Sequence, residues 1–225
     1  CEVLASGGVS IEGIGSSKLI IQGSGGKLLD IQDFAVIPDR IEAGTYIIMA
    51  AAMADDVTIE NIIPLHVEAL TSKLIEMGVN MEIGVDSIRI LKSEDLKAVD
   101  FTTQTYPGFA TDLQQPMTTL LTRAEGASTV KETIYAERFK HTAELQRMGA
   151  TISVGTAQAT ITGVTPLFGN KVTATDLRAG ASLVIAGLMA DGITEIHDIY
   201  HIDRGYDEID SKLKALGAKF WRETI

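Results

Sequence analysis

Arginines and aspartates that recur just before apolar segments are the residues of this sequence best suited to chemistry. Four of the eight arginines lie where a helix is expected to begin or in the loop that leads into it: Arg40, Arg138, Arg178 and Arg204. The planar guanidinium group binds phosphate and carboxylate groups through paired hydrogen bonds. In a chain with a formal net charge of −11, this set indicates a site for an anionic ligand. The alternative is a set of ordinary loop arginines paired with nearby aspartates such as Asp39 and Asp203.

Asp112 and Asp176 each precede an apolar segment, and each allows two interpretations. Aspartate is favoured at the N-cap of a helix, where its carboxylate accepts hydrogen bonds from free backbone amides. Beside an anion site, the same carboxylate could instead act as a general base towards a hydroxyl group. The neighbouring Arg178 favours the structural interpretation for Asp176.

These aspartates belong to a threefold internal repeat, which must position them. Three segments align, and they begin at Asp39, Asp112 and Asp176. Each segment contains an apolar helix, a short β-rich stretch, a loop, an amphipathic helix and two strands. The amphipathic helices end in glycines suited to a left-handed cap, namely Gly78, Gly149 and Gly217.

The apolar helix of each unit is hydrophobic on nearly every side and should be buried. We expect these helices at 43–54, 117–125 and 179–190. With the strand that precedes each aspartate, at 98–103 and 170–174 in the second and third units, each unit reads β-α-β-α-β-β. The predicted fold is therefore of the α/β class.

Three similar units arranged about an axis would place the apolar helices in parallel, with their N-termini at one common mouth. Each N-terminus carries roughly half a positive charge and free amides, so the mouth should attract anions. The segment Tyr106–Phe109 (YPGF) predicts a tight turn that enters this mouth, or simply a turn with an aromatic plug.

Residues 1–36 resemble the strands that follow the second helix of a unit. We read CEVLASGGVSIEGIGSSKLIIQG as strand, turn and strand, with no opening helix. The expected organisation is a remnant of a preceding domain and crossover at 1–36, followed by a three-repeat domain at 37–225. A native N-terminal hairpin is the alternative.

The composition narrows the class of protein further. A chain of 225 residues that is 45% hydrophobic and 22% charged can bury a core and is not simply disordered. Its acidic balance argues against a general nucleic-acid or anionic-membrane binder. With Cys1 as its single cysteine, it can form neither an intrachain disulfide nor a multi-cysteine zinc site. His197 and His201 lack a third ligand, so no metal site is predicted.

Four segments closely resemble the UDP-N-acetylglucosamine (UDP-GlcNAc) enolpyruvyl transferases. They are YPGFATDLQQP (106–116), ETIYAERFKHTAELQRMGA (132–150), ATDLRAGASLVIAGL (174–188) and IYHIDRGYDEIDSKLKALGA (199–218). The YPGF-TD and HIDRGY motifs are the most specific. The resemblance implies an inside-out α/β barrel, with helices inside, sheets outside, and substrates bound where the helix N-termini converge.

The implied reaction moves the enolpyruvyl group of phosphoenolpyruvate to the 3-hydroxyl of UDP-GlcNAc and releases phosphate, with no metal or organic cofactor. By resemblance, Asp112 contacts the sugar hydroxyl and is the favoured base. Ile134 and Tyr135 line the nucleotide-sugar site, where the family usually has Phe in place of Tyr135. Arg138 and Arg204 lie on the phosphoenolpyruvate side, and Arg204 is counted with Asp112 as catalytic.

The resemblance gives Asp176 a supporting role and implies a cytoplasmic enzyme of peptidoglycan synthesis, and thereby of cell-wall biogenesis, cell shape and division. A shikimate-pathway relative and a non-catalytic anion-binding repeat domain are the alternatives. The family has a Lys-Asn pair near its N-terminus and a mobile loop with a proton-donating Cys or Asp in its other, N-terminal domain, and neither is found in this chain. We therefore expect the chain to need that domain as a partner, to be inactive alone, and to leave a sheet edge incomplete where the family adds an N-terminal strand.

Overall fold

The computed structural model describes residues 1–223, which form two compact units, Cys1–Ile37 and the remainder of the chain from Pro38. The first unit contains helix α1 (Glu2–Ser6) and an antiparallel hairpin of β1 (Ser10–Glu12) and β2 (Ile20–Gln22). The sequence interpretation without an opening helix was wrong. Glu, Leu and Ala are good helix formers, and the helix ends at Gly7 before Gly8, whose φ of +92° suits glycine.

The second unit repeats one motif three times. Its first repeat contains α2 (Arg40–Met53), β3 (Asp56–Glu60), a 3₁₀ turn η1 (Pro64–Val67), α3 (Glu68–Glu76), β4 (Met81–Ile83) and β5 (Ser87–Leu91). The second contains β6 (Phe101–Thr102), a 3₁₀ turn η2 (Thr111–Leu113), α4 (Gln114–Leu121), β7 (Gly126–Lys131), α5 (His141–Arg147), β8 (Thr151–Gly155) and β9 (Gln158–Gly163). The third contains β10 (Lys171–Thr173), α6 (Leu177–Met189), β11 (Glu195–His197), α7 (Tyr200–Asp203) and α8 (Ile209–Ala215).

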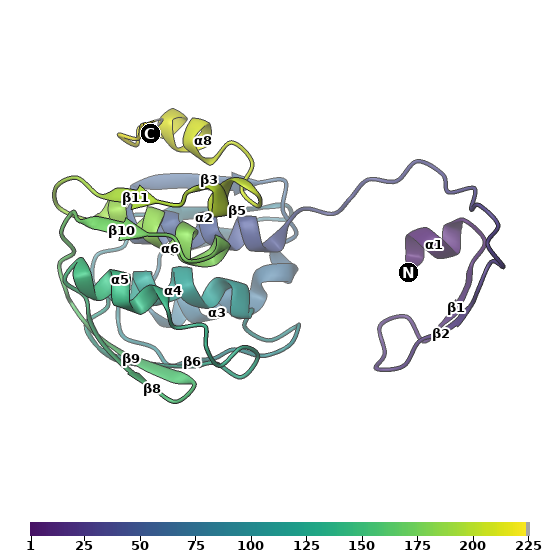
Figure 1. Cartoon of the computed structure of the whole chain (residues 1–225), viewed down its shortest axis with the longest axis horizontal. Coiled ribbons are helices and arrows are strands. Elements are labelled where there is room, and N and C mark those ends of the chain that lie inside the picture. The colour runs from purple at the N-terminus through teal and green to yellow at the C-terminus, as the bar shows by residue number, and fades with distance from the viewer. Residues whose placement is uncertain (224–225) are drawn as a thin grey trace. The chain divides into compact units, whose positions relative to one another are not determined.

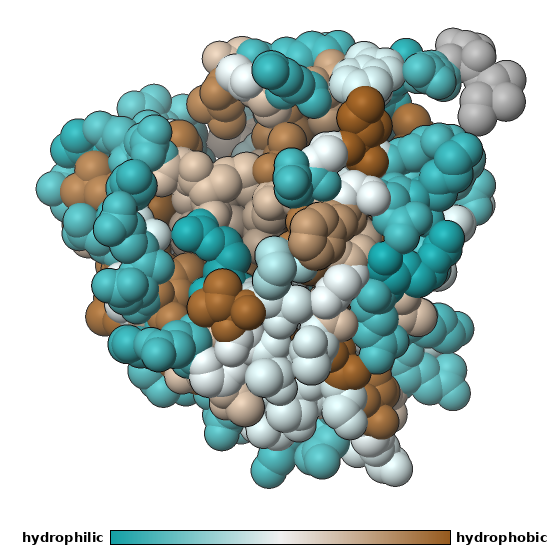
Figure 2. All heavy atoms as spheres, turned by 90° about the vertical axis from the view of Figure 1, so that its left-hand side faces the viewer, coloured by the Kyte–Doolittle hydropathy of each residue, from teal (hydrophilic) through white to brown (hydrophobic). Residues whose placement is uncertain are grey.

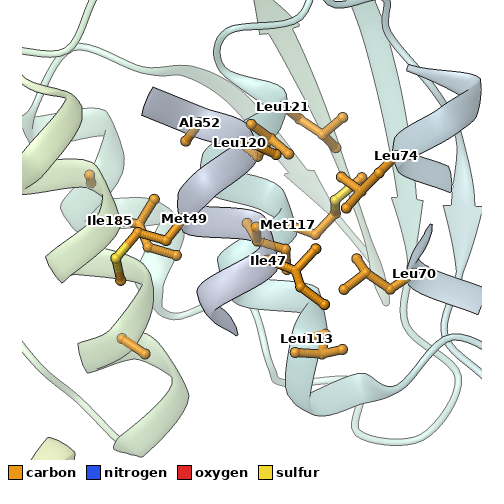
Figure 3. Close-up of a cluster of buried hydrophobic side chains, with 14 of the residues drawn as sticks. Ile47, Met49, Ala52, Leu70, Leu74, Leu113, Met117, Leu120, Leu121 and Ile185 are labelled. Atoms are coloured by element: carbon orange, nitrogen blue, oxygen red, sulfur yellow. The ribbon is translucent and has the colours of Figure 1, made fainter. Parts of the chain in front are cut away.

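Helices α2, α4 and α6 form the centre of this unit, and the sheets lie outside them (Figure 1). The central helices are buried as predicted, and all eight residues of α4 are buried even though Gln114, Gln115, Thr118 and Thr119 are polar. Figure 3 shows side chains of α2, α3 and α4 gathered in one buried cluster, among them Ile47, Leu74 and Met117. Glycine permits the close approach of α2 to the start of α4, because a Cβ on Gly44 would lie 2.6 Å from the side chain of Leu113. The predicted inside-out α/β arrangement is confirmed.

The three sheets differ in the number of strands among the described residues. The second repeat has four strands in the order β6-β7-β9-β8, the first has three in the order β3-β5-β4, and the third has the parallel pair β10-β11. The outer edge of β3 therefore lacks a counterpart of β6, and β11 lacks counterparts of β9 and β8. Within residues 38–223, the sheets of the first and third repeats thus have fewer strands than that of the second, and completion of one of them by a strand from the family's N-terminus stays a prediction.

Beside the open edge of β3 lies a groove of about 1270 Å³, lined by α2, β3 and α8. Apart from Asp39, it is not lined by the aspartates and arginines singled out in the sequence. Figure 2 shows a different face, the one on the left-hand side of Figure 1. On this face, apolar residues lie toward the middle and hydrophilic residues are common around the margin. No helix among residues 1–223 is both long enough and apolar enough to cross a membrane.

Candidate functional site

The aspartates at the three repeat starts do not play the same part. Asp39 and Asp176 are N-caps: Asp39 accepts hydrogen bonds from the amides of Ile41 and Glu42, and Asp176 accepts them from the two residues that follow Leu177. Asp112 caps no helix, because α4 is preceded by the 3₁₀ turn Thr111–Leu113 and Asp112 accepts no bond from its backbone amides. Its carboxylate is therefore available for another purpose.

Two arginines from different repeats hold the Asp112 carboxylate. One oxygen lies 2.6 Å from Nη2 of Arg138, and the other lies 3.5 Å from Nη2 of Arg178. The side chains of the arginines are 19% and 13% exposed, whereas that of Asp112 is 35% exposed. The carboxylate thus remains accessible to a small molecule while its orientation is set by two mostly buried cations.

A hydrogen-bonded chain extends this cluster to the first repeat. Nη1 of Arg178 donates to the hydroxyl of Tyr206 at 3.2 Å, and that hydroxyl lies 2.9 Å from the hydroxyl of Thr45 in α2. Burial raises the pKa of Tyr206. Arg40 completes the mouth, with its guanidinium 5.3 Å from the ring centroid of Tyr106. Since these residues come from all three repeats, the predicted convergence of the central helices at one mouth is confirmed.

A buried carboxylate, Glu132, lies behind Asp112 and Arg138. It is 2% exposed and accepts hydrogen bonds from the hydroxyls of Thr103, at 2.6 Å, and Thr111, at 2.8 Å. The hydroxyl of Thr111 in turn accepts a hydrogen bond from Nη1 of Arg138 at 2.9 Å. Glu132 follows strand β7 directly, so the end of that strand brings it beneath the site.

The loop after β7 carries two of the predicted substrate-binding residues. Ile134 and Tyr135 are 47% and 53% exposed. Their backbone amides donate to the carboxylate of Glu132, at 2.8 and 3.1 Å. The loop is thereby tied to the same buried group that contacts Thr111, next to Asp112.

Within the part of the chain that the structure describes, the side chains of the remaining predicted site residues form no hydrogen bond or ion pair with those of Asp112, Arg138 or Arg178. Arg204 is exposed, follows α7, and makes no side-chain hydrogen bond or ion pair with any residue of the described range 1–223. It stands two residues before Tyr206, whose hydroxyl belongs to the cluster. Asp176 lies at the mouth but is used as a cap. In the YPGF turn, Phe109 is the buried plug against Phe101, with ring centroids 4.2 Å apart, whereas Tyr106 is 55% exposed.

Several members of the cluster were not predicted from the sequence as site residues. They are Thr45, Thr111, Glu132 and Tyr206. Arg178 belongs to the set of arginines that the sequence indicates for an anion site, and a signal existed for Thr111, which stands in the TD pair. Nothing in the spacing links Thr45 to Tyr206, because 161 positions separate them.

A buried histidine lies beside this cluster. His141, at the start of α5, is fully buried, and neither of its ring nitrogens has a partner in hydrogen-bond geometry among residues 1–223. Burial lowers its pKa to about 3, and the carboxylate of Asp176 opposes that shift only in part. The ring is therefore neutral in the folded protein near pH 7.

No three His, Cys, Asp or Glu side chains within residues 1–223 are grouped as a metal site would require. His197 instead lies 2.8 Å from the carboxylate of Glu195 on the same strand. What the mouth offers chemically is one accessible carboxylate that can accept a proton, beside guanidinium groups that can bind an anion.

Comparison with known proteins relates this arrangement to a family. A family model described as EPSP synthase (3-phosphoshikimate 1-carboxyvinyltransferase) matches residues 1–213. The chain is 54% identical over 224 residues to UDP-N-acetylglucosamine 1-carboxyvinyltransferase 2 of Bacillus subtilis (strain 168). It is 48% identical over 222 residues to UDP-N-acetylglucosamine 1-carboxyvinyltransferase of Helicobacter pylori (strain HPAG1). These alignments cover 99% of this chain but 52% and 53% of the relatives, so the chain spans about half the length of the curated relatives it matches.

Solved structures show the same relationship. The enolpyruvyl transferase NikO from Streptomyces tendae matches with a TM-score of 0.87 and 30% sequence identity, over 97% of this chain and 52% of that chain. An EPSP synthase from Acinetobacter baumannii matches with a TM-score of 0.70 and 22% identity, over 95% of this chain and 52% of that chain, which shows a shared fold. The resemblance predicted from the YPGF-TD and HIDRGY segments is confirmed. Because the family model spans residues 1–213, the chain belongs to the EPSP synthase family of 1-carboxyvinyl (enolpyruvyl) transferases.

Proposed function

We propose that the protein translated from the complete reading frame, here called the complete gene product, transfers the enolpyruvyl group of phosphoenolpyruvate to the 3-hydroxyl of UDP-GlcNAc. The observation that carries this proposal is the Asp112 carboxylate, which caps no helix and is held by Arg138 and Arg178 at the mouth. The names of the curated relatives favour UDP-GlcNAc as the acceptor.

In the proposed reaction, the 3-oxygen of the sugar forms a bond to the central carbon of phosphoenolpyruvate, and Asp112 accepts the proton of that hydroxyl group. The methylene carbon gains a proton and later loses it, and the bond to the phosphate oxygen breaks to release phosphate. Arg138 and Arg204 bind the anionic groups of phosphoenolpyruvate, and Ile134 and Tyr135 contact the nucleotide sugar. Asp176 supports this end of the site as the N-cap of α6.

The proposal extends to the setting of the reaction. The residues 1–36 would belong to a neighbouring domain, and a second domain of the gene product would supply the missing proton donor. The reaction would serve peptidoglycan synthesis in the cytoplasm, and through it cell shape and division.

The test is release of phosphate from phosphoenolpyruvate by the complete gene product, measured with UDP-GlcNAc and, separately, with shikimate 3-phosphate as acceptor. We expect release with UDP-GlcNAc only. Release with shikimate 3-phosphate alone would assign the other acceptor. Binding of phosphoenolpyruvate without release for either acceptor would indicate an anion-binding domain.

Arg204 is tested by Arg204→Lys in the complete gene product. We expect kcat/KM for phosphoenolpyruvate to fall by about 10-fold or more, because lysine keeps the charge but cannot form the paired hydrogen bonds of a guanidinium group. Arg89→Lys is the matched control, since Arg89 pairs with Asp56 on an outer sheet. If Arg204→Lys behaves like the control for both kcat and KM, Arg204 lies outside the site.

A further inference from the structure

We propose that Glu132 is a positioning residue that fixes the nucleotide-sugar loop and the Asp112–Arg138 pair through one buried carboxylate. This inference rests on the proposed function, because it assigns Glu132 a part in that reaction. Glu132 is the charged residue of the cluster that is almost completely shielded from solvent, at 2% exposure, so it acts through other residues and not by touching substrate.

Glu132 anchors the start of the loop that follows β7. One oxygen of Glu132, Oε1, accepts hydrogen bonds from the amides of Ile134 and Tyr135 and from the hydroxyl of Thr103. A buried carboxylate with several donors strongly restrains the groups that bind it. The exposed side chains of Ile134 and Tyr135 are therefore presented from a loop whose backbone is anchored at its start.

Glu132 also sets the direction of the Thr111 hydroxyl group. The other oxygen, Oε2, can only accept, so the hydroxyl of Thr111 must donate to it, over 2.8 Å. That leaves the lone pairs of Thr111 to receive Nη1 of Arg138, at 2.9 Å. With Nη1 held in this way, the planar guanidinium group directs Nη2 to Asp112, at 2.6 Å.

Both guanidinium groups pair with Asp112, whereas Glu132 is connected to Arg138 only through the hydroxyl of Thr111. If Glu132 were absent, Arg138 would lose its oriented acceptor at Thr111 and would be free to rotate around Asp112. Misplacement of a catalytic group by about 1 Å can cost about 100-fold in rate.

Glu132→Gln separates the anchoring of the loop from the orientation of the Thr111 hydroxyl. The glutamine oxygen can still accept from the amides of Ile134 and Tyr135, whereas its NH₂ group would face Thr111 and donate, which reverses the hydrogen bond. In the complete gene product we therefore expect kcat to fall by about 10- to 100-fold with little change in KM for UDP-GlcNAc. Glu132→Ala removes both the contacts to the loop amides and the contact to Thr111, so it should also raise KM for UDP-GlcNAc.

Thr111 provides the rescue test. Thr111→Val removes the hydroxyl at nearly constant shape and should reproduce the loss of kcat seen in Glu132→Gln, whereas Thr111→Ser keeps the hydroxyl and should restore most of kcat. Combining Glu132→Gln with Thr111→Val should cost little more than either change alone, since both break the same contact. Glu137→Gln, in an exposed position of the same loop, is the matched control.

Amide hydrogen exchange of Ile134 and Tyr135 gives a readout that does not depend on activity. We expect exchange to be faster in Glu132→Ala and close to wild type in Glu132→Gln. Wild-type kcat in Glu132→Gln, or a loss of kcat in Thr111→Ser as large as in Thr111→Val, would overturn the inference while the proposed function stands. A wild-type protein that releases no phosphate with UDP-GlcNAc would instead contradict the proposed function, and the assigned role with it.

Discussion

Asp112→Asn in the complete gene product is expected to lower kcat by about 10²- to 10⁴-fold, the usual contribution of a general base. Asparagine has almost the same size as aspartate but cannot take the proton of the sugar hydroxyl. The structure also removes the capping explanation, because Asp112 caps no helix, and the change should lower kcat far more than it disturbs folding. Steady-state phosphate release and thermal unfolding of the same preparations measure the two effects.

Asp39→Asn is the matched control for this prediction. Asp39 begins the first repeat as Asp112 begins the second, but its carboxylate accepts the amides of Ile41 and Glu42. Asparagine is nearly as good an N-cap as aspartate, so this variant should keep both its activity and its stability. If Asp112→Asn retains wild-type kcat, the carboxylate is a structural partner of Arg138 and Arg178 and not the base.

The unfolding free energy of the chain is expected to fall by about 2 kcal/mol between pH 7 and pH 5 because of His141 alone. The folded pKa of this ring is lowered to about 3 by burial, whereas the ordinary pKa of histidine, which applies to the unfolded chain, is 6.5. Below about 6.5, the unfolded chain therefore binds a proton that the folded chain excludes. Stability is unaffected by this group above that pH and is lost progressively as the pH falls toward 3.

Urea unfolding at pH 7 and pH 5 checks this expectation. His141→Leu has no titrating ring and buries no unpaired nitrogen. The loss of unfolding free energy between pH 7 and pH 5 should therefore be smaller in this variant than in the wild type by about 2 kcal/mol. His66→Leu, which removes a partly exposed histidine of the 3₁₀ turn η1, is the matched control. An equal dependence on pH in the wild type and in His141→Leu would show that the ring does not resist protonation in the folded state.

Much of the fold could be predicted from local patterns. The apolar sequence around Ile47 and Ile185 is hydrophobic on nearly all sides, and such a helix is stable only in a core, which is where α2 and α6 lie. Periodicity is a short-range property, so it locates elements well but not their ends. The central helix of the second repeat begins at Gln114 and not at Met117, because a 3₁₀ turn replaces the expected cap. The helix at Glu2–Ser6 was missed because five residues are too few to establish a helical period.

The threefold repeat, the buried helices and the family could be recognised in the sequence, because they depend on motifs and on spacing within one repeat, and the resemblance also singled out Asp112, Arg138, Ile134 and Tyr135 as expected site residues. Whether an aspartate caps a helix or holds two arginines depends on contacts between repeats, so it is visible only in the packed protein. Arg178 reaches Asp112 from another repeat, and Tyr206 meets Thr45 across 161 positions. The role of Glu132 depends likewise on burial and on the direction of one hydroxyl group, which are properties of the packed protein and leave no periodic trace in the chain.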